Sequence, residues 1–379
     1  LGTVVYVPTH LSNLDSPVFA YALQAAGLPP VTYGAGKNLF TNPVLSFFMR
    51  NLGAYRVDRR LRFELYKHVL KAYSCICIER GFHSLFFPGG TRSRSGGVER
   101  KLKLGLAGTG LEAFIRTSQR GRPRKVFFVP STINYMLTLE AETLIDDWLQ
   151  EQGKARYIIE DDESTRLDRM TTLARKLVQM EDSCAVRFGQ PLDPFGNEVD
   201  EFGVSHDSRG REVDPTTYVT RDGQPVVDHA RDAQYTRELG EVVMKHYLKD
   251  TIAMPTHVVA TAAFACLRRR MPSADLFALV RRHDEVVVPY QEFVDEIERT
   301  QRRLVELEGR GDIVLSSAVR GATATELLGD AERALNGYHS HAILRTREQG
   351  VALLDPKVLL YYQNRPAAHG VAFHGGVAR

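Results

Sequence analysis

In the first half of the chain, short runs of β-branched and aromatic residues alternate with longer stretches that have helical spacing. Strands are predicted over residues 3–7, 53–57, 84–87, 126–129 and 184–188. Helices are predicted between them, over residues 16–26, 61–80 and 104–118. A chain that alternates strands with helices folds as an α/β domain whose sheet is covered by helices. We therefore expect a mixed sheet flanked by helices.

The helix predicted over residues 61–80 is amphipathic. Its apolar side includes Phe63, Leu65, Val69, Leu70, Tyr73 and Ile76. Cys75 and Cys77 lie in the same helix without a matching second pair of ligands. This context favours structural cysteines over a metal site.

With 379 residues, the chain is too long for one small domain. The strand–helix pattern stops near residue 192, and residues 193–234 are rich in Asp, Gly, Arg and Pro. A loose repeat there places a turn-forming glycine before each short β-prone run, which predicts small surface hairpins; a disordered insert is the alternative. The chain is then mostly helical, with short strands expected at 313–317 and 342–354. We predict an α/β domain over 1–192, a polar insert over 193–234 and a mainly helical domain over 235–379.

Composition excludes several classes of protein. The net charge of +3 and the pI near 8.6 are too mild to indicate nucleic-acid binding. No apolar run reaches the about 18 residues that a membrane-spanning helix needs. Four cysteines in a chain of this size indicate a reducing compartment. The chain begins Leu1-Gly2-Thr3, without Met and leading straight into a predicted strand, so we expect native sequence upstream.

A histidine and an aspartate follow the first predicted strand. His10 and Asp15 precede the next helix, and α/β sheets place reactive groups at such strand ends. Histidine can take a proton from an alcohol, and an aspartate can hold the other ring nitrogen. A His–Asp pair without a nucleophilic Ser or Cys suits direct transfer to a substrate hydroxyl. Taken alone, however, this spacing favours a structural His10 that caps the helix or fills a core contact.

A glycine-rich basic loop follows the strand predicted at residues 84–87. Its glycines let the backbone approach an anion, and Arg92 and Arg94 offer forked donors that match a phosphate. The Gly-x-x-x-x-Gly-Lys-Ser/Thr pattern of a nucleotide P-loop is absent. Alone, the loop is equally consistent with a solvated basic turn. Two further segments, Gly53 to Arg60 and Phe128 to Ser131, are uninformative by themselves.

Together, and in this order, these segments resemble the four sequence blocks of the glycerolipid acyltransferases. The blocks are His10-x4-Asp15, Gly53 to Arg59, Phe87 to Arg94, and Val129-Pro130. The resemblance covers about residues 3–192. Other stretches are similar to the glycerol-3-phosphate acyltransferase branch in particular, namely residues 34–39 leading into 52–54, then 254–261 and 361–364. Residues 193–232 have no counterpart in it.

The resemblance implies an O-acyltransferase of phospholipid biosynthesis that acylates the sn-1 hydroxyl of glycerol 3-phosphate. His10 would be the general base on that hydroxyl, with Asp15 as its orienting partner. The acyl donor would be acyl-CoA or acyl carrier protein. Because a thioester is already activated, neither a metal nor a further cofactor is expected. The residues implied to bind the substrates are Arg59, Gly90, Thr91, Arg92, Arg94 and, on the acyl-donor side, Pro130.

Two residues depart from the family pattern. Gly89 stands where the family usually has a glutamate thought to contact the glycerol part of the acceptor, which leaves the acceptor open. Arg56 replaces a usual aromatic residue, and either adds a phosphate donor or points to solvent. The second interpretation is therefore an enzyme that acylates lysophosphatidate to phosphatidate.

Two alternatives belong to other classes. One is a non-catalytic relative that binds lipid or phosphate, but a dead enzyme has no chemical reason to retain His10, Asp15, Arg59 and Arg92. The other is an esterase that uses Ser12 or Ser16 with His10, but the Gly-x-Ser-x-Gly elbow is missing.

Basic and aromatic residues are interleaved between residues 37 and 62. They are Lys37, Phe40, Phe47, Phe48, Met49, Arg50, Arg56, Arg59, Arg60 and Arg62. Such a mixture suits a face that lies on anionic lipid, or a core helix with a charged rim. Because the implied product is a lipid, we expect a peripheral protein on the cytoplasmic face of a membrane. A lipid surface, and no nucleic acid, is the expected partner.

Overall fold

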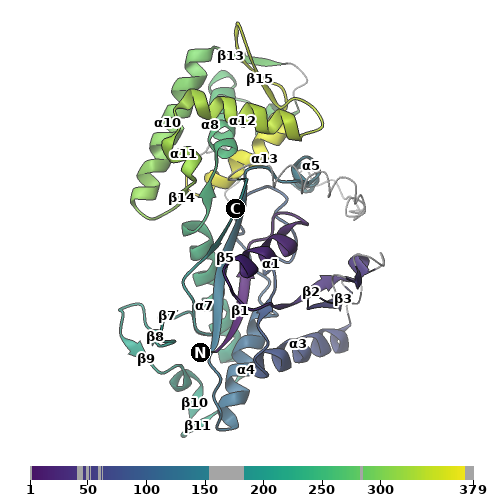
Figure 1. Cartoon of the computed structure of the whole chain (residues 1–379), viewed down its shortest axis with the longest axis vertical. Coiled ribbons are helices and arrows are strands. Elements are labelled where there is room, and N and C mark those ends of the chain that lie inside the picture. Colours follow the sequence, from purple (N-terminus) through teal and green to yellow (C-terminus); the bar gives the residue numbers. More distant parts are fainter. Residues whose placement is uncertain are drawn as a thin grey trace.

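A computed structural model of the chain describes residues 2–40, 46–47, 51, 53–58, 61, 63–152, 183–281 and 285–371. Its centre is a six-stranded sheet (Figure 1). The strands are β1 (Thr3–Pro8), β2 (Thr32–Gly36), β3 (Ala54–Val57), β4 (Ser84–Leu85), β5 (Val126–Tyr135) and β6 (Cys184–Phe188). Their spatial order is β3-β2-β4-β1-β5-β6. All neighbours are parallel except β5 and β6, so the predicted α/β fold with a mixed sheet is confirmed.

Helices separate most of the strands of this sheet along the chain. They are α1 (Asp15–Ala25), the 3-10 helix η1 (Lys37–Phe40), α3 (Glu64–Glu79), α4 (Ala107–Gln119) and α5 (Ala141–Gln152). All ten residues of β5 are buried, because this strand is paired on both edges and covered by packed elements. Its register aligns Pro8 of β1 with Ser131. Residues that follow β1 therefore emerge at the carboxyl edge of the parallel strands, where open α/β sheets bind ligands.

The segment after β6 forms small antiparallel hairpins, as the glycine-containing repeat predicts. Its elements are β7 (Glu198–Val199), β8 (Ser205–His206), β9 (Glu212–Val213), the 3-10 helix η2 (Pro215–Val219), β10 (Thr220–Arg221) and β11 (Gln224–Pro225). β8 pairs with both β7 and β9, and β10 pairs with β11. These hairpins project from the amino end of the sheet in Figure 1, on the side away from α1.

The C-terminal part is mostly helical, as predicted. Its helices are α7 (His229–Lys249), α8 (Pro255–Arg270), α9 (Leu276–Val280), α10 (Tyr290–Gly309), α11 (Ser317–Gly321), α12 (Ala324–Tyr338) and α13 (Pro356–Ala367). Its strands are β12 (Ile252–Ala253), β13 (Val286–Val288), β14 (Val314–Leu315), β15 (Leu344–Arg347) and β16 (Gly350–Leu353). α7 runs alongside the sheet and leads into this part (Figure 1).

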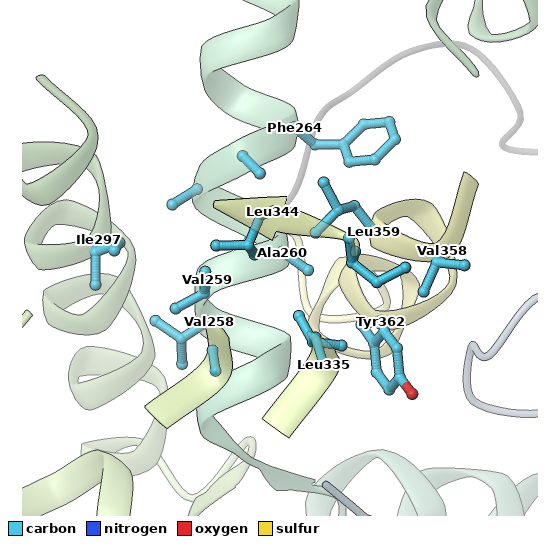
Figure 2. Close-up of a cluster of buried hydrophobic side chains, with 14 of the residues drawn as sticks. Val258, Val259, Ala260, Phe264, Ile297, Leu335, Leu344, Val358, Leu359 and Tyr362 are labelled. Atoms are coloured by element: carbon cyan, nitrogen blue, oxygen red, sulfur yellow. The ribbon is translucent and has the colours of Figure 1, made fainter. Parts of the chain in front are cut away.

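α8 is the central element of the C-terminal core. Twelve of its 16 residues are buried, and α10, α12 and α13 pack around it. Figure 2 shows Val258, Val259 and Phe264 of α8 among side chains from these neighbours, such as Leu335 and Leu359. A helix that is apolar on nearly all sides belongs in a core. α13, which also contacts α5 of the α/β part, is thereby held in place.

His257 makes the stability of this core depend on pH. Its ring is buried and its Nδ1 accepts the main-chain N–H of Met254 at 3.1 Å. Burial, followed by the charge of Arg365, lowers the pKa of His257 from 6.5 to about 3. The unfolded chain therefore binds one more proton between these two pH values, so stability falls as the pH falls from about 6.5 towards 3. Between pH 7 and pH 5, protonation of His257 in the unfolded chain should lower the unfolding free energy of the wild type by about 2 kcal/mol. His257→Gln should not show this part of the decrease. Urea denaturation at the two pH values measures the difference.

The matched control is His206→Gln. His206 is partly exposed, and its hydrogen bond to Asp200 raises its pKa. His206 therefore contributes to stability at low pH and loses this contribution as the pH rises, which is opposite to the pH dependence expected for His257. A His257 variant with the same pH dependence as the wild type would contradict the argument.

The apolar side of α3 faces solvent, which differs from the usual packing of an amphipathic helix. Leu65, Val69, Tyr73 and Ile76 are between 43% and 71% exposed, and we call these four residues the α3 stripe. Among the helices that the structure describes, none has both the length and the apolar character needed to cross a bilayer.

Small residues on α3 explain this orientation. The buried residues of the helix are Ser74, Cys75 and Ile78. Ser74 Oγ lies 3.0 Å from Thr109 Oγ1 of α4, and short side chains of this kind let two helix backbones approach closely. Burial raises the pKa of Cys75 to about 12, so this thiol is poorly suited to bind a metal as a thiolate.

Candidate active site

The loop between β1 and α1 holds a histidine–aspartate pair. His10 Nδ1 lies 2.7 Å from Asp15 Oδ2. Oδ2 also accepts the main-chain N–H groups of Leu11 at 2.6 Å and Ser12 at 3.0 Å. Oδ1 accepts the hydroxyl of Tyr135 at 2.8 Å. The Asp15 carboxylate is fully buried at the start of α1, and these four donors offset the cost of burying its charge.

This pair determines which nitrogen of His10 can accept a proton. Since a carboxylate only accepts, Nδ1 of the neutral ring carries the proton and Nε2 keeps its lone pair. The ring stacks on Phe87, with 4.2 Å between centroids and an interplanar angle of 22°. Its orientation is thus fixed by a hydrogen bond at one edge and an aromatic contact on one face. The arrangement presents Nε2 as a general base.

The main chain of His10 is held from both sides. Its carbonyl oxygen accepts the N–H of Ser93 at 2.7 Å. Its own N–H donates to Glu99 Oε1, also at 2.7 Å. Both partners belong to the glycine-rich segment that follows β4. The sequence segment 88–99 therefore packs directly against the base.

Gly90 shapes the glycine-rich loop. Its φ of +73° lies in the left-handed region, and its N–H donates to the carbonyl of Phe87 at 3.0 Å. A Cβ at this position would lie only 2.5 Å from Lys103 Cδ and 2.9 Å from Lys103 Nζ. The Lys103 side chain therefore lies across the loop where the glycine leaves space. A cation and a bare backbone at one point can attract a phosphate.

Arg92 is anchored by a buried glutamate. Its Nη1 donates to Glu140 Oε1 at 3.1 Å, and the same oxygen accepts the N–H of Asn13 at 3.0 Å. Glu140 Oε2 accepts the hydroxyl of Ser12 at 2.9 Å. Burial raises the pKa of Glu140, while the Arg92 charge opposes that rise. Glu140 thus ties Arg92 to the loop that carries His10.

The other predicted site residues are placed less centrally. Arg94 pairs with Glu151 at 3.1 Å on the surface, and Thr91 is exposed. Pro130 is buried within β5, where its carbonyl accepts the N–H of Gly189 at 2.7 Å. Arg59 lies outside the described residues.

Several of the basic and aromatic residues between 37 and 62 also lie outside the described ranges, namely Phe48, Met49, Arg50, Arg60 and Arg62. Arg56 lies over the ring of Phe40, with 5.0 Å from Cζ to the centroid. Lys37 Nζ lies 3.3 Å from Asp58 Oδ2.

The C-terminal helix α13 reaches the glycine-rich loop. Asn364 Nδ2 donates to the Ser95 carbonyl at 2.9 Å. A Cβ on Gly96 would lie 2.3 Å from the carbonyl oxygen of Tyr361, so this position tolerates only glycine. Tyr362 Oη accepts the N–H of Thr138 at 3.2 Å. The Tyr-Tyr-Gln-Asn segment, which is remote in sequence, therefore packs against the loop.

The sequence patterns did not indicate several residues of this site. Tyr135 and Glu140 lie at and just beyond the carboxyl end of β5, which is parallel to β1. A search for polar residues at the carboxyl ends of parallel strands could have found both. Glu99 and Arg365 gave no local signal. Across the described ranges, no group of three or more His, Cys, Asp or Glu side chains is arranged to hold a metal ion.

Comparisons with known proteins find similarity to acyltransferases. The Acyltransferase family model matches residues 1–134. A glycerol-3-phosphate acyltransferase from Pseudomonas fluorescens (strain SBW25) is 29% identical over 297 residues, which is 76% of this chain and 31% of the relative. The enzyme of the same name from Pseudomonas putida (strain W619) is 25% identical over 345 residues, covering 90% of this chain and 38% of the relative. The chain thus spans about a third of the length of these curated relatives.

A search of solved structures finds a weaker similarity. The crystal structure of the 1-acyl-sn-glycerophosphate (LPA) acyltransferase PlsC from Thermotoga maritima matches with a TM-score of 0.29 and 17% sequence identity. The match covers 53% of this chain and 60% of the other.

Proposed function

We propose that this chain, whose residues 1–134 match the Acyltransferase family model, moves a fatty acyl group from an acyl thioester to the sn-1 hydroxyl of glycerol 3-phosphate. The observation that carries the proposal is the His10–Asp15 pair, which leaves Nε2 free as a base beside a cationic glycine-rich loop. The relatives named glycerol-3-phosphate acyltransferase support the choice of acceptor.

In the proposed reaction, Nε2 of His10 takes the proton of the glycerol hydroxyl as its oxygen attacks the thioester carbonyl carbon. An ester C–O bond forms and the C–S bond breaks. The proton then passes from Nε2 to the departing thiolate of coenzyme A or acyl carrier protein, so the base is regenerated. Among the described residues, the His10 ring is hydrogen-bonded to Asp15 through Nδ1, and no serine or cysteine bonds to Nε2, which supports direct transfer without an acyl-enzyme.

The phosphate of the acceptor would bind at the glycine-rich loop. Arg92 and Lys103 are the described cations that support this placement, with Gly90 and Thr91 forming the turn and Arg94 at its outer side. Arg59 remains a proposed phosphate ligand from the resemblance alone. Pro130 is proposed for the acyl-donor side, where it would help to set the packing beside β1.

We also propose that the protein associates peripherally with a membrane surface. The α3 stripe supports this, because four large apolar side chains on one helix are exposed to water at a free-energy cost that a lipid interface would remove. Lys67 and Lys71 of the same helix are exposed and would favour anionic lipid. The proposed product is a lipid, which also fits a reaction at a membrane surface.

The test offers labelled palmitoyl-CoA or palmitoyl-carrier protein with glycerol 3-phosphate and with lysophosphatidate in parallel assays. Label in lysophosphatidate supports the proposed acceptor. Label only in phosphatidate would make the protein the next enzyme of the pathway, which is the alternative that Gly89 leaves open. Transfer to neither acceptor, by folded protein with lipid vesicles present, would contradict both.

Flotation with anionic vesicles in the same samples tests the proposed membrane association, and protein that stays at the bottom of the gradient contradicts it.

A further inference from the structure

Gly89 lies directly against the side chain of Glu99. A Cβ added at Gly89 would lie 3.2 Å from Glu99 Cγ and 3.5 Å from Glu99 Oε1. The first contact is tighter than ordinary packing, so a larger residue at 89 would have to displace Glu99. An oxygen 3.5 Å from that Cβ is also within the reach of a glutamate side chain grown from position 89. The carboxylate of Glu99 thus occupies space that a glutamate at 89 could fill.

The oxygen that faces Gly89 is also the one that holds the base. Glu99 Oε1 accepts the N–H of His10 at 2.7 Å. The other oxygen, Oε2, is buried and has no hydrogen-bond partner in the described part of the chain. Burial raises the pKa of Glu99, and the charge of Arg365 opposes the rise. A buried carboxyl group with one unused oxygen costs free energy, so its presence beside the base requires an explanation.

Arg365 supports Glu99 from the C-terminal helix. It is buried in α13, and its Nη2 donates to the carbonyl oxygen of Ile133 at 3.3 Å and to Asn134 Oδ1 at 3.2 Å. Its Nε and Nη1 have no partner within the described ranges. The charge of Arg365 opposes the rise in the pKa of Glu99, and the charge of Glu99 opposes the fall in the pKa of Arg365, so the two groups stabilise one another.

We propose that Glu99 is a positioning residue for acyl transfer, which fixes the main chain of His10 from the space that a glutamate at position 89 would take. The proposal rests on the proposed role of His10 as the base. The N–H of Ser93 holds the carbonyl oxygen of His10, and Glu99 holds its N–H, so the main chain on both sides of His10 is fixed. Losing one of these restraints misplaces Nε2, and a displacement of about 1 Å can cost about a hundredfold in rate.

The experiment moves the carboxylate between the two positions. Glu99→Ala is expected to lower kcat by about 10- to 100-fold and to change the KM for glycerol 3-phosphate by less than about threefold. Glu99→Gln keeps an acceptor oxygen and is expected to stay within about fivefold of the wild type. Gly89→Glu alone crowds Glu99 and should be slow. The double variant Gly89→Glu with Glu99→Ala should recover at least about tenfold over Glu99→Ala, because the carboxylate returns from the other side.

Amide hydrogen exchange in the peptide covering residues 8–16 provides a readout that is independent of turnover. Exchange should be faster in Glu99→Ala and slow again in the double variant. Glu326→Ala is the control, because Glu326 also accepts a main-chain N–H, from Thr323 at 2.8 Å, but lies in α12 away from the site. A double variant that is no faster than Glu99→Ala and exchanges equally fast would overturn the proposal. If the wild type transfers no acyl group, the proposed function is wrong. The exchange data still test whether Glu99 restrains the main chain of His10.

Discussion

Replacing His10 by Ala is expected to lower acyl transfer by about 10² to 10⁴, the range that general-base catalysis contributes. The fold should survive, because the Asp15 carboxylate keeps its hydrogen bonds from Leu11, Ser12 and Tyr135. We therefore expect kcat to fall while the KM for glycerol 3-phosphate changes little. Steady-state kinetics with labelled acyl donor measure both.

The chain provides a matched control in a second histidine–aspartate pair. His206 Nε2 lies 3.0 Å from Asp200 Oδ2, on the β7–β8 hairpin. His206→Ala removes a similar interaction far from the glycine-rich loop, so activity should be unchanged. A folded His10→Ala protein with wild-type kcat would show that another group takes the proton.

Phe264→Ala is expected to lower the free energy of unfolding by about 3–5 kcal/mol. Phe264 is fully buried in α8, within the cluster that joins α8 to α12 and α13 (Figure 2). Truncation removes the apolar contacts of the ring and leaves a cavity that a helix packed on several sides cannot close. Chemical denaturation followed by circular dichroism measures the change.

Val305→Ala is the control for this core. Val305 lies on α10, which packs against α8, but its own side chain is half exposed. A loss of less than about 0.5 kcal/mol is expected there. Equal losses in the two variants would contradict the placement of α8 at the centre of the core.

The sequence predicts those elements whose local signal agrees with their environment. Thr3–Pro8 and Val126–Tyr135 are rich in β-branched and aromatic residues and are buried strands. β2 (Thr32–Gly36) was not predicted, because its segment Thr-Tyr-Gly-Ala-Gly has two glycines and an alanine. Hydrogen bonds from β3 and β4 on its two sides, rather than propensity, make it a strand.

The orientation of α3 could not be predicted from its apolar residues. Periodicity identifies two faces of a helix, but it does not say which one packs against the domain. Here Ser74 and Cys75 make the close contact with α4, and the α3 stripe is left outside. The surface of α4 determines which face of α3 packs, and α4 lies in a different segment of the chain.

The candidate site was predictable only where its residues are close in sequence. His10 and Asp15 are five positions apart and form the expected pair. Glu140 reaches the same loop from 128 positions away, and Arg365 lies further still. Partners of this kind depend on strand order and helix packing, which no local pattern encodes. The resemblance gave the residues that carry the proposed chemistry, and the structure adds the residues that hold them.

The bond between Ser95 and Asn364 joins positions that are 269 residues apart. A ribosome adds about 5–20 residues per second, so the glycine-rich loop leaves it on the order of 10–60 s before α13 exists. During that interval a nascent chain has its histidine and aspartate but lacks the helix that closes the loop over Ser95 and Gly96. The loop that packs against His10 can therefore take its final contacts with α13 only after residues 356–367 have been synthesised.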